Sequence, residues 1–399
     1  MRRASFVLCW ALAVPFAAPT LKAQVAPTIH QAVERQIADK VVPGAIVYVA
    51  EDHKVLHFEA QGAAMVRDRT VPLRTDQGLW LASLAKPITA VAVLMLVDEG
   101  KLNLDDPVGK YVPAFAAAGR VAMLKPGAQP PARGVKPDPA DYELVPATSP
   151  ITIRQLLTHT SGLPVAVDVP EAPITPGMTL AEWAPTLAKA PLESQPGGRW
   201  AYNNAAAFHL LSRVVEIVSR EPYDQFLQQR LFDPLAMKRT GFGPALYGNN
   251  IVPIPIPLTD PVIGAATFKS GAAGIWSTID DYARFAQMLA DGGRVGNRRL
   301  LSDRSVTMLR TNQVGALFTT LQGRSAVPGA FGFGLAVAVV SDPVAGGVSV
   351  PAGSFGWAGG GGARFWASPR PNRVVVMYAP PPKAQIAIEQ AVAAALPAQ

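Results

Sequence analysis

The pattern of hydrophobic positions divides the chain into strand-rich ends and a helical middle. Near the start, β-rich runs at 45–50 and 55–60 flank a polar turn, which predicts a hairpin. The apolar run at 83–99 stops at Gly100, which predicts a buried helix. Strand-like runs return in the C-terminal part, at 334–340, 363–367 and 373–378.

Helical spacing dominates the middle of the chain. Phe208, Leu211, Val215 and Val218 recur on one face of a helix predicted over 205–219. Further helices are predicted over 31–40, 153–157, 180–190, 277–289 and 384–396. Residues 120–149 are rich in Pro, Gly and Ala, which predicts a long surface excursion.

This arrangement predicts an α+β fold in which the first and last thirds share one sheet. We expect a sheet domain made of residues 24–100 and 265–399, with a helical domain inserted at 101–264. An active site is expected at the boundary between them. The 399 residues, 49% of them hydrophobic, suffice for a large core.

The N-terminus has the composition of a secretory signal peptide. Met1-Arg2-Arg3 is basic, residues 6–18 are apolar, and Ala23 offers a cleavage point before Gln24. The apolar run is short for a membrane anchor, so we expect cleavage after residue 23 and a secreted or periplasmic protein. The single cysteine, Cys9, leaves with that segment, which excludes disulfides and cysteine-ligated metals from the mature chain.

Charge excludes other classes of partner. Loss of Arg2, Arg3 and Lys22 with the signal peptide lowers the formal charge from +7 to +4. The basic residues form no run, so nucleic-acid binding is not supported. No later segment reaches the length of a membrane span, so stable membrane insertion is not expected.

Ser83 and Lys86 are the first candidates for chemistry. Three residues apart at the start of a helix, they share a face, so their side chains can meet. A serine needs a base to become a nucleophile, and a lysine kept neutral by desolvation can serve. A helix N-terminus at Ser83 also supplies free N–H groups.

The residues "ASLAK" (82–86), followed by an apolar helix, resemble the serine β-lactamase-like hydrolases. This family includes class C β-lactamases, D-alanyl-D-alanine peptidases and related esterases. Similar segments run through the mature chain: "KLNLDDPVGKYVPAF" (101–115), "ITIRQLLTHTSGLP" (151–164), "PGGRWAYNN" (196–204) and "GAAGIWSTIDDYARFAQML" (271–289). The resemblance implies the β-lactamase/transpeptidase-like fold, with an antiparallel sheet flanked by helices and a mostly helical lobe.

Tyr202 and Asn204 match the family's Tyr-x-Asn element. The resemblance implies that Tyr202 exchanges protons with Ser83 and the leaving group, while Asn204 binds Lys86 and the acyl part of the substrate. A cation beside a phenol lowers the pKa of the phenol, which favours general-base work by Tyr202. A second match at Tyr247 lies in a loop with no following helix and is interpreted as chance.

Trp357 departs from the family's best-known pattern. Where β-lactamases carry Lys-Thr-Gly, this chain has Trp357-Ala358-Gly359, which resembles the esterase branch (family VIII carboxylesterases). A tryptophan supplies no charge for an anionic substrate, whereas a flat apolar wall suits an uncharged ester. Arg364 is a weaker candidate for a substitute cation, and simple packing is the alternative for Trp357.

Gly359 and Gly360 are candidate substrate-binding residues. Glycines allow close backbone approach, and the resemblance implies an oxyanion hole made by the N–H groups of Gly360 and Ser83. Neither a Gly-x-Ser-x-Gly nor a His-Glu-x-x-His motif occurs.

The histidines are interpreted as structural groups. His53 and His57 are placed on the surface of the predicted hairpin, and His209 is placed in the core. By resemblance, His159 supports the site loop and is not a catalytic base.

The sequence thus predicts a secreted serine hydrolase that cleaves carboxylic esters through an acyl-enzyme on Ser83. Alternatives are a β-lactamase, a D-alanyl-D-alanine carboxypeptidase or D-aminopeptidase-type amide hydrolase, an acyl transferase, and a non-catalytic protein that keeps the fold. No metal or cofactor is implied, and the partner is a small-molecule ester or amide. The natural substrate, the acyl chain length and the oligomeric state stay open.

Overall fold

The first strands of the chain pair with the last ones in an eight-stranded antiparallel sheet, ordered β13-β14-β15-β16-β17-β1-β2-β3. The computed structural model describes residues 21–67, 69–117, 119–129, 138–203, 205–321, 324–325, 327–380 and 382–396. The strands are β1 (Gly44–Glu51), β2 (Lys54–Val66), β3 (Arg69–Pro72), β13 (Phe331–Phe333), β14 (Ala338–Val340), β15 (Phe355–Ala358), β16 (Ala363–Pro369) and β17 (Asn372–Tyr378). The predicted shared sheet is therefore confirmed.

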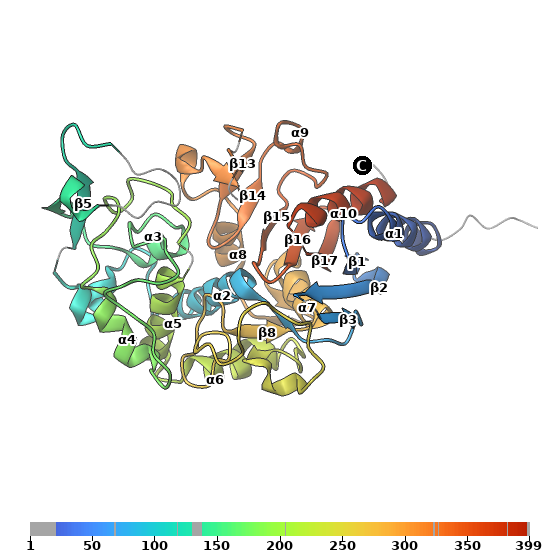
Figure 1. Cartoon of the computed structure of the whole chain (residues 1–399), viewed down its shortest axis with the longest axis horizontal. Helices are drawn as coiled ribbons and strands as arrows, with labels where there is room; N and C mark the ends of the chain where they lie inside the picture. The colour runs from blue at the N-terminus through green and yellow to red at the C-terminus, as the bar shows by residue number, and fades with distance from the viewer. Residues whose placement is uncertain are drawn as a thin grey trace, which may run out of the picture.

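Helices cover both faces of this sheet, because successive strand residues point to opposite sides. Val47 and Met377 belong to the core cluster beneath α1 (Leu21–Ala38) and α10 (Pro382–Ala395), which lie side by side near the chain ends (Figure 1). Ile46 and Val376 belong to the main core on the other face, where α7 (Ile279–Ala290) packs on β16 and β17. Two layers of helix thus enclose the sheet.

The helix α2 (Ala85–Asp98) lies between the sheet and a helical lobe (Figure 1), and the candidate nucleophile Ser83 lies in the turn just before it. Its residues 85–96 are all buried, which explains why the sequence there is apolar on every side. The lobe contains α3 (Ile153–Leu157), α4 (Leu180–Leu187), α5 (Ala206–Ser219) and α6 (Tyr223–Leu227). Thr152 and Thr179 each start a helix with a capping box, so local sequence sets these ends.

The remaining elements are short. They are β4 (Leu79–Trp80), β5 (Arg120–Leu124), β6 (Tyr142–Pro146), β7 (Gly241–Phe242), β8 (Ile275–Ser277), β9 (Arg294–Val295), β10 (Arg298–Arg299), β11 (Thr320–Leu321), β12 (Arg324–Ser325), α8 (Asp303–Leu309), α9 (Pro343–Gly346), six 3₁₀ turns and the π-helical η5 (Gln228–Phe232). The 3₁₀ turns are η1 (Ala82–Leu84), η2 (Val108–Lys110), η3 (Pro113–Phe115), η4 (Pro139–Asp141), η6 (Pro244–Tyr247) and η7 (Gly315–Leu317).

Four sequence expectations need correction or stay open. The surface excursion predicted over 120–149 is a hairpin of β5 and β6, in which Arg120 is opposite Pro146. Because the middle of this segment is rich in Pro and Gly, the sequence pattern did not indicate the two strands. The helix α1 begins at Leu21, earlier than predicted, and the predicted signal peptide lies largely outside the described residues. The predicted domain division at 101–264 also stays a prediction.

Candidate active site

Ser83 lies in a sharp turn between β4 and α2. It is the middle residue of η1, not the first residue of a regular α-helix, and its side chain is half-buried. The residue before it, Ala82, has a φ of 47°, a left-handed conformation that costs a non-glycine residue about 1 kcal/mol or more. Nothing in the local sequence predicted the strained conformation of Ala82. The turn places the Ser83 hydroxyl above the first turn of α2.

Lys86 is buried completely beneath Ser83. Its Nζ donates a hydrogen bond to Ser83 Oγ at 3.1 Å and another to the carbonyl oxygen of Ala272 at 3.3 Å. The ammonium position also lies 5.3 Å from the centre of the Tyr202 ring and 5.6 Å from that of Phe208. The expected meeting of Ser83 and Lys86 is therefore present.

Burial controls the pKa values of the two groups that flank Ser83. Desolvation lowers the pKa of Lys86 to about 7, so a large fraction of the amine is neutral near pH 7. Desolvation raises the pKa of Tyr202 to about 12, against the opposing effect of its hydrogen bonds with Ser83 and Trp357. The expectation that Lys86 acidifies the phenol is wrong in direction. In this geometry the lysine is the group that titrates near neutrality.

Tyr202 reaches the site from the chain that precedes α5. Trp357, on β15, donates its indole N–H to the phenol oxygen of Tyr202 at 3.2 Å, and the two ring centres lie 5.3 Å apart. Trp357 thus occupies the position expected beside the nucleophile. Its contact with Tyr202 is polar as well as apolar.

The glycine loop after β15 packs directly on the turn that carries Ser83. A Cβ added at Gly359 would lie 2.1 Å from the carbonyl oxygen of Leu81, so only glycine fits there. The N–H of Gly359 is used, since it donates to the carbonyl oxygen of Ala363 at 2.8 Å. A Cβ at Gly360 would meet nothing within 4 Å, so open space lies in front of that residue. Gly360 is exposed there, as an oxyanion donor requires.

His159 and Asn203 hold the Tyr202 segment in place. The backbone N–H of Asn203 donates to His159 Nδ1 at 3.1 Å, and the His159 ring centre lies 4.6 Å from that of Tyr202. The Asn203 side chain donates to the carbonyl oxygen of Pro164 and accepts the N–H of Ala207 at 2.9 Å. Asn203 was not among the predicted site residues, and it lies two residues before Ala205, the N-cap of α5. Asn204 lies outside the described residues.

His159 is a neutral structural group. Burial lowers the pKa of His159 well below its usual range, and the charge of Lys86 lowers it further. Because Nδ1 accepts a hydrogen bond, the ring proton belongs on Nε2, which is buried with no acceptor among the described residues. The interpretation of His159 as a structural group agrees with this environment.

Arg364 is not a substitute cation. Its guanidinium is buried on the α10 side of the sheet, where Nη1 lies 3.1 Å from Glu389 Oε2. The side chain of Trp357 projects to the other face, because residues 357 and 364 occupy offset positions on β15 and β16. The apolar character expected at Trp357 is therefore not compensated by Arg364.

The other candidates lie outside the site. His209 is buried and bonds Ser270 Oγ at 3.0 Å, in agreement with a core position, and Tyr247 is buried beside Trp276. His53 is exposed as expected, whereas His57 is buried and its surface placement was wrong. The β2 strand turns His57 toward α1, and burial lowers its pKa.

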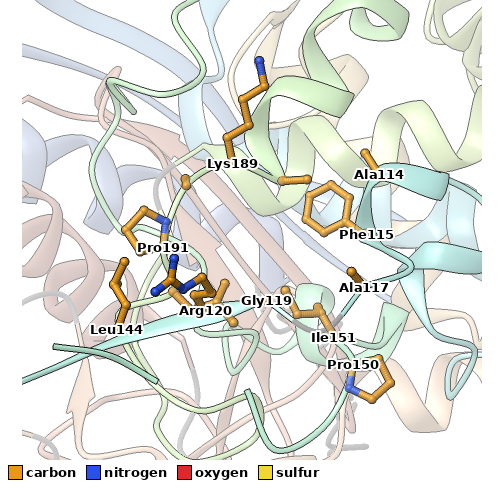
Figure 2. A pocket seen from close by; sticks show the side chains of 13 residues that line it. Ala114, Phe115, Ala117, Gly119, Arg120, Leu144, Pro150, Ile151, Lys189 and Pro191 are labelled. Carbon is orange, nitrogen blue, oxygen red and sulfur yellow. The ribbon is translucent and has the colours of Figure 1, made fainter. Parts of the chain in front are cut away.

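Two surface cavities lie on the helical side of the molecule. One, of about 360 Å³, is formed by the β5–β6 hairpin, η3 and residues 188–192 (Figure 2). The other, of about 490 Å³, is lined by residues 97–98, 100–106 and 110, by Arg154 and by residues 304, 305 and 308. Neither is lined by Ser83, Lys86 or Tyr202, so neither is the reaction site.

The described ranges contain neither a membrane-spanning helix nor a cluster of metal-ligating side chains. No helix there is long and apolar enough to cross a membrane. In the same residues, no group of three or more His, Cys, Asp and Glu side chains is arranged to hold a metal ion.

Comparisons with known proteins show which family and fold this chain has. Residues 29–396 match the family described as Beta-lactamase. The chain is 31% identical to Protein Rv1367c of Mycobacterium tuberculosis (87% of this chain, 88% of that one) and 28% identical to Esterase EstB of Burkholderia gladioli (84% and 86%). The solved structure of EstCE1, "a hydrolase with promiscuous acyltransferase activity", superposes with a TM-score of 0.73 at 24% identity, over 93% of this chain and 99% of that one.

The match to the family spans nearly all described residues, from α1 to α10. The predicted β-lactamase/transpeptidase-like fold is thereby confirmed. The chain belongs to the β-lactamase family of hydrolases.

Proposed function

We propose that the protein is a serine hydrolase that cleaves carboxylic esters through an acyl-enzyme on Ser83. The observation that carries the proposal is the 3.1 Å hydrogen bond between Ser83 Oγ and a fully buried Lys86, whose pKa is lowered to about 7. A neutral amine at this distance is a competent base for a serine hydroxyl. EstB, named as an esterase, supports the choice of an ester as substrate.

The first half-reaction forms the acyl-enzyme. Lys86 accepts the proton of Ser83 as Oγ attacks the ester carbonyl, and the N–H groups of Ser83 and Gly360 stabilise the oxyanion. The C–O bond of the alcohol then breaks. Tyr202 gives its phenol proton to the departing oxygen and regains a proton from Lys86, which restores the neutral amine. A high phenol pKa suits this donor role, because Tyr202 stays protonated until the leaving group needs the proton.

The second half-reaction uses water in place of the alcohol. Water attacks the acyl-enzyme carbonyl and passes a proton through the same groups, which releases the carboxylic acid and Ser83. An alcohol that takes the place of water would make the protein an acyl transferase. The similarity to EstCE1, described as a hydrolase with promiscuous acyltransferase activity, supports that alternative.

A β-lactamase or D,D-peptidase function is supported less well. Such substrates carry a carboxylate. Where β-lactamases carry the lysine of Lys-Thr-Gly, this chain has Trp357, whose indole N–H donates a hydrogen bond to Tyr202. Arg364 is paired with Glu389 on the opposite face. Neither Trp357 nor Arg364 therefore offers a cation to the carboxylate of such a substrate.

The test is hydrolysis of p-nitrophenyl butyrate by the mature protein, with Ser83→Ala in parallel and a chromogenic cephalosporin as the second substrate. We expect ester turnover that falls to background in Ser83→Ala, and slow or no cephalosporin opening. Ester turnover at the wild-type rate in Ser83→Ala would refute the acyl-enzyme. Cephalosporin opening faster than ester turnover would favour the β-lactamase alternative, and a serine-reactive phosphonate that forms no adduct would favour a non-catalytic protein.

Secretion is part of the proposal. It is supported by the basic start of the chain and the apolar residues 6–18. N-terminal sequencing of the protein recovered from the periplasm or medium is expected to begin at Gln24. A mature protein that retains residues 1–23 and stays in the cytoplasm would contradict it.

A further inference from the structure

A half-buried apolar surface lies beside the glycine loop of the site. Trp80 packs with Ile251, Ile254 and Ile256 around a small core that is separate from the main one. That core consists of Tyr247, Ile263 and Trp276. The four half-buried residues are here called the Trp80 surface. None of the four carries a charge, and an apolar surface of this kind beside a catalytic group is a candidate binding surface.

The Trp80 surface reaches the site through Gly361. A Cβ added at Gly361 would lie 2.2 Å from the carbonyl oxygen of Trp80 and 3.4 Å from Cε3 of its indole ring. The preceding glycine, Gly360, faces open space. Gly359 lies against the carbonyl of Leu81, which is two residues before Ser83. Gly360, which faces open space, therefore lies between two glycines that pack against residues 80–82.

The indole of Trp80 is fixed, and its only donor is occupied. Its Nε1 donates to the carbonyl oxygen of Ala273 at 2.6 Å, next to Ala272, whose carbonyl accepts from Lys86. A bound molecule thus meets ring carbon atoms and no unfilled N–H. This environment favours a hydrocarbon over a polar group.

Backbone contacts hold the segment that carries the isoleucines against Gly78, two residues before Trp80. Gly78 N–H donates to the carbonyl oxygen of Asn250 at 2.9 Å, and Val252 N–H donates to that of Gly78 at 2.9 Å. Arg67 Nη2 donates to the carbonyl oxygen of Pro255 at 3.2 Å. Prolines at 253, 255 and 257 have no N–H that needs an acceptor, so this segment lies at the surface without a neighbouring strand.

Tyr202 and Trp80 contact opposite ends of the segment 357–361. Tyr202 is bonded to Trp357 on β15, whereas Trp80 adjoins the far end of the glycine loop, four residues after Trp357. In the proposed reaction the alcohol leaves with the proton of Tyr202, so the alcohol occupies the Tyr202 side. The acyl group then extends toward Gly361 and the Trp80 surface.

We propose that the Trp80 surface binds the hydrocarbon chain of the acyl group, which makes esters of medium-length aliphatic acids the preferred substrates. The inference rests on the proposed function, because it needs an acyl group on Ser83. Burial of one methylene is worth about 0.8 kcal/mol, so kcat/KM rises about fourfold per methylene until the surface is covered.

The experiment measures kcat/KM for p-nitrophenyl esters from acetate to octanoate, and for a parallel series of alkyl acetates. The variants are Trp80→Ala and the double substitution Ile254→Ala/Ile256→Ala, which keeps the β4 strand intact if Trp80→Ala folds poorly. The matched control is Leu246→Ala, because Leu246 is 57% exposed and is not part of the surface. All assays use the mature chain.

The proposal expects kcat/KM to rise from acetate to octanoate in the wild type. The double variant should lose at least about tenfold on octanoate and less than about twofold on acetate. Leu246→Ala should match the wild type on both. A flat profile in the wild type, an equal loss on all acyl chains in the double variant, or a loss that follows alcohol length would each overturn it. Failure of the proposed function is separate, since it appears as no Ser83-dependent turnover of acetate.

Discussion

The indole N–H of Trp357 donates to the phenol oxygen of Tyr202 across 3.2 Å. A phenol oxygen that accepts this bond directs its own proton elsewhere, and Ser83 is the other hydrogen-bond partner of Tyr202. Trp357 therefore does more than provide a flat wall, which was the role expected from the sequence. It sets the direction in which Tyr202 donates and lowers the pKa that burial raises.

Trp357→Phe tests this relationship. The substitution removes the donor and keeps a ring, so we expect kcat on p-nitrophenyl butyrate to fall about 3- to 10-fold, the usual worth of one hydrogen bond. KM should change little. Trp366→Phe is the matched control, because it makes the same exchange of an indole for a phenyl ring at a position on β16 beside Arg364. Equal kcat values for Trp357→Phe and Trp366→Phe would contradict the role.

The pH dependence of the reaction should report Lys86. The neutral amine is the base, so kcat/KM should rise with pH, level off above about pH 8, and fall tenfold per unit below about pH 7. The released alcohol is measured by chromatography between pH 5 and 9. A profile without a change of slope between pH 6 and 8 would show that Lys86 does not titrate in this reaction.

Burial of Lys86 should also lower the free energy of unfolding near neutral pH. Its folded pKa is lowered from 10.5 to about 7, so the unfolded chain binds more protons between these values. The free energy of unfolding is therefore not reduced by Lys86 above pH 10.5, and it falls as the pH drops from 10.5 toward 7. Lys86→Met should lack this dependence and stabilise the fold by about 4 kcal/mol at pH 7 while it abolishes turnover. Urea unfolding at pH 7 and 9 gives the comparison, and a less stable variant at pH 7 would contradict the prediction.

Gly359 and Gly360 form a matched pair. Gly359→Ala places a Cβ 2.1 Å from the Leu81 carbonyl, whereas Gly360→Ala meets no atom within 4 Å. We expect Gly359→Ala to lose at least about 2 kcal/mol of stability through displaced backbone, and Gly360→Ala to unfold like the wild type. Thermal unfolding of both variants is the measurement. Similar melting temperatures would show that the loop moves freely away from the Ser83 turn.

The buried pair of Arg364 and Glu389 should matter for stability and not for turnover. Arg364→Met leaves Glu389 buried without its cation, and we expect a loss of about 3 kcal/mol. Adding Glu389→Leu should recover most of that loss, because no buried charge is then left alone. Unfolding in urea and ester kcat/KM are measured together. A tenfold loss of kcat/KM in folded Arg364→Met would place Arg364 in the reaction after all.

Much of the fold was predictable from local pattern. The hairpin of β1 and β2 followed from two β-rich runs around a polar turn, and the apolar run before Gly100 predicted α2. The β5–β6 hairpin was missed because its strands are short and half-exposed, so they carry no clear alternation. His57 was misplaced because a period of two does not say which face of a strand is covered.

By itself the sequence determined the family, the α+β layout and the approach of Lys86 to Ser83, because a spacing of three on a helix is a local property. Only the tertiary structure decided the direction of the two pKa shifts, the hydrogen bond from Trp357 to Tyr202 and the burial of Arg364 away from the site. Each of these depends on residues more than 20 positions apart in the chain, such as Tyr202 and Trp357. Desolvation and hydrogen bonding act over a few ångströms in space, and the sequence does not show which distant segments the fold brings that close.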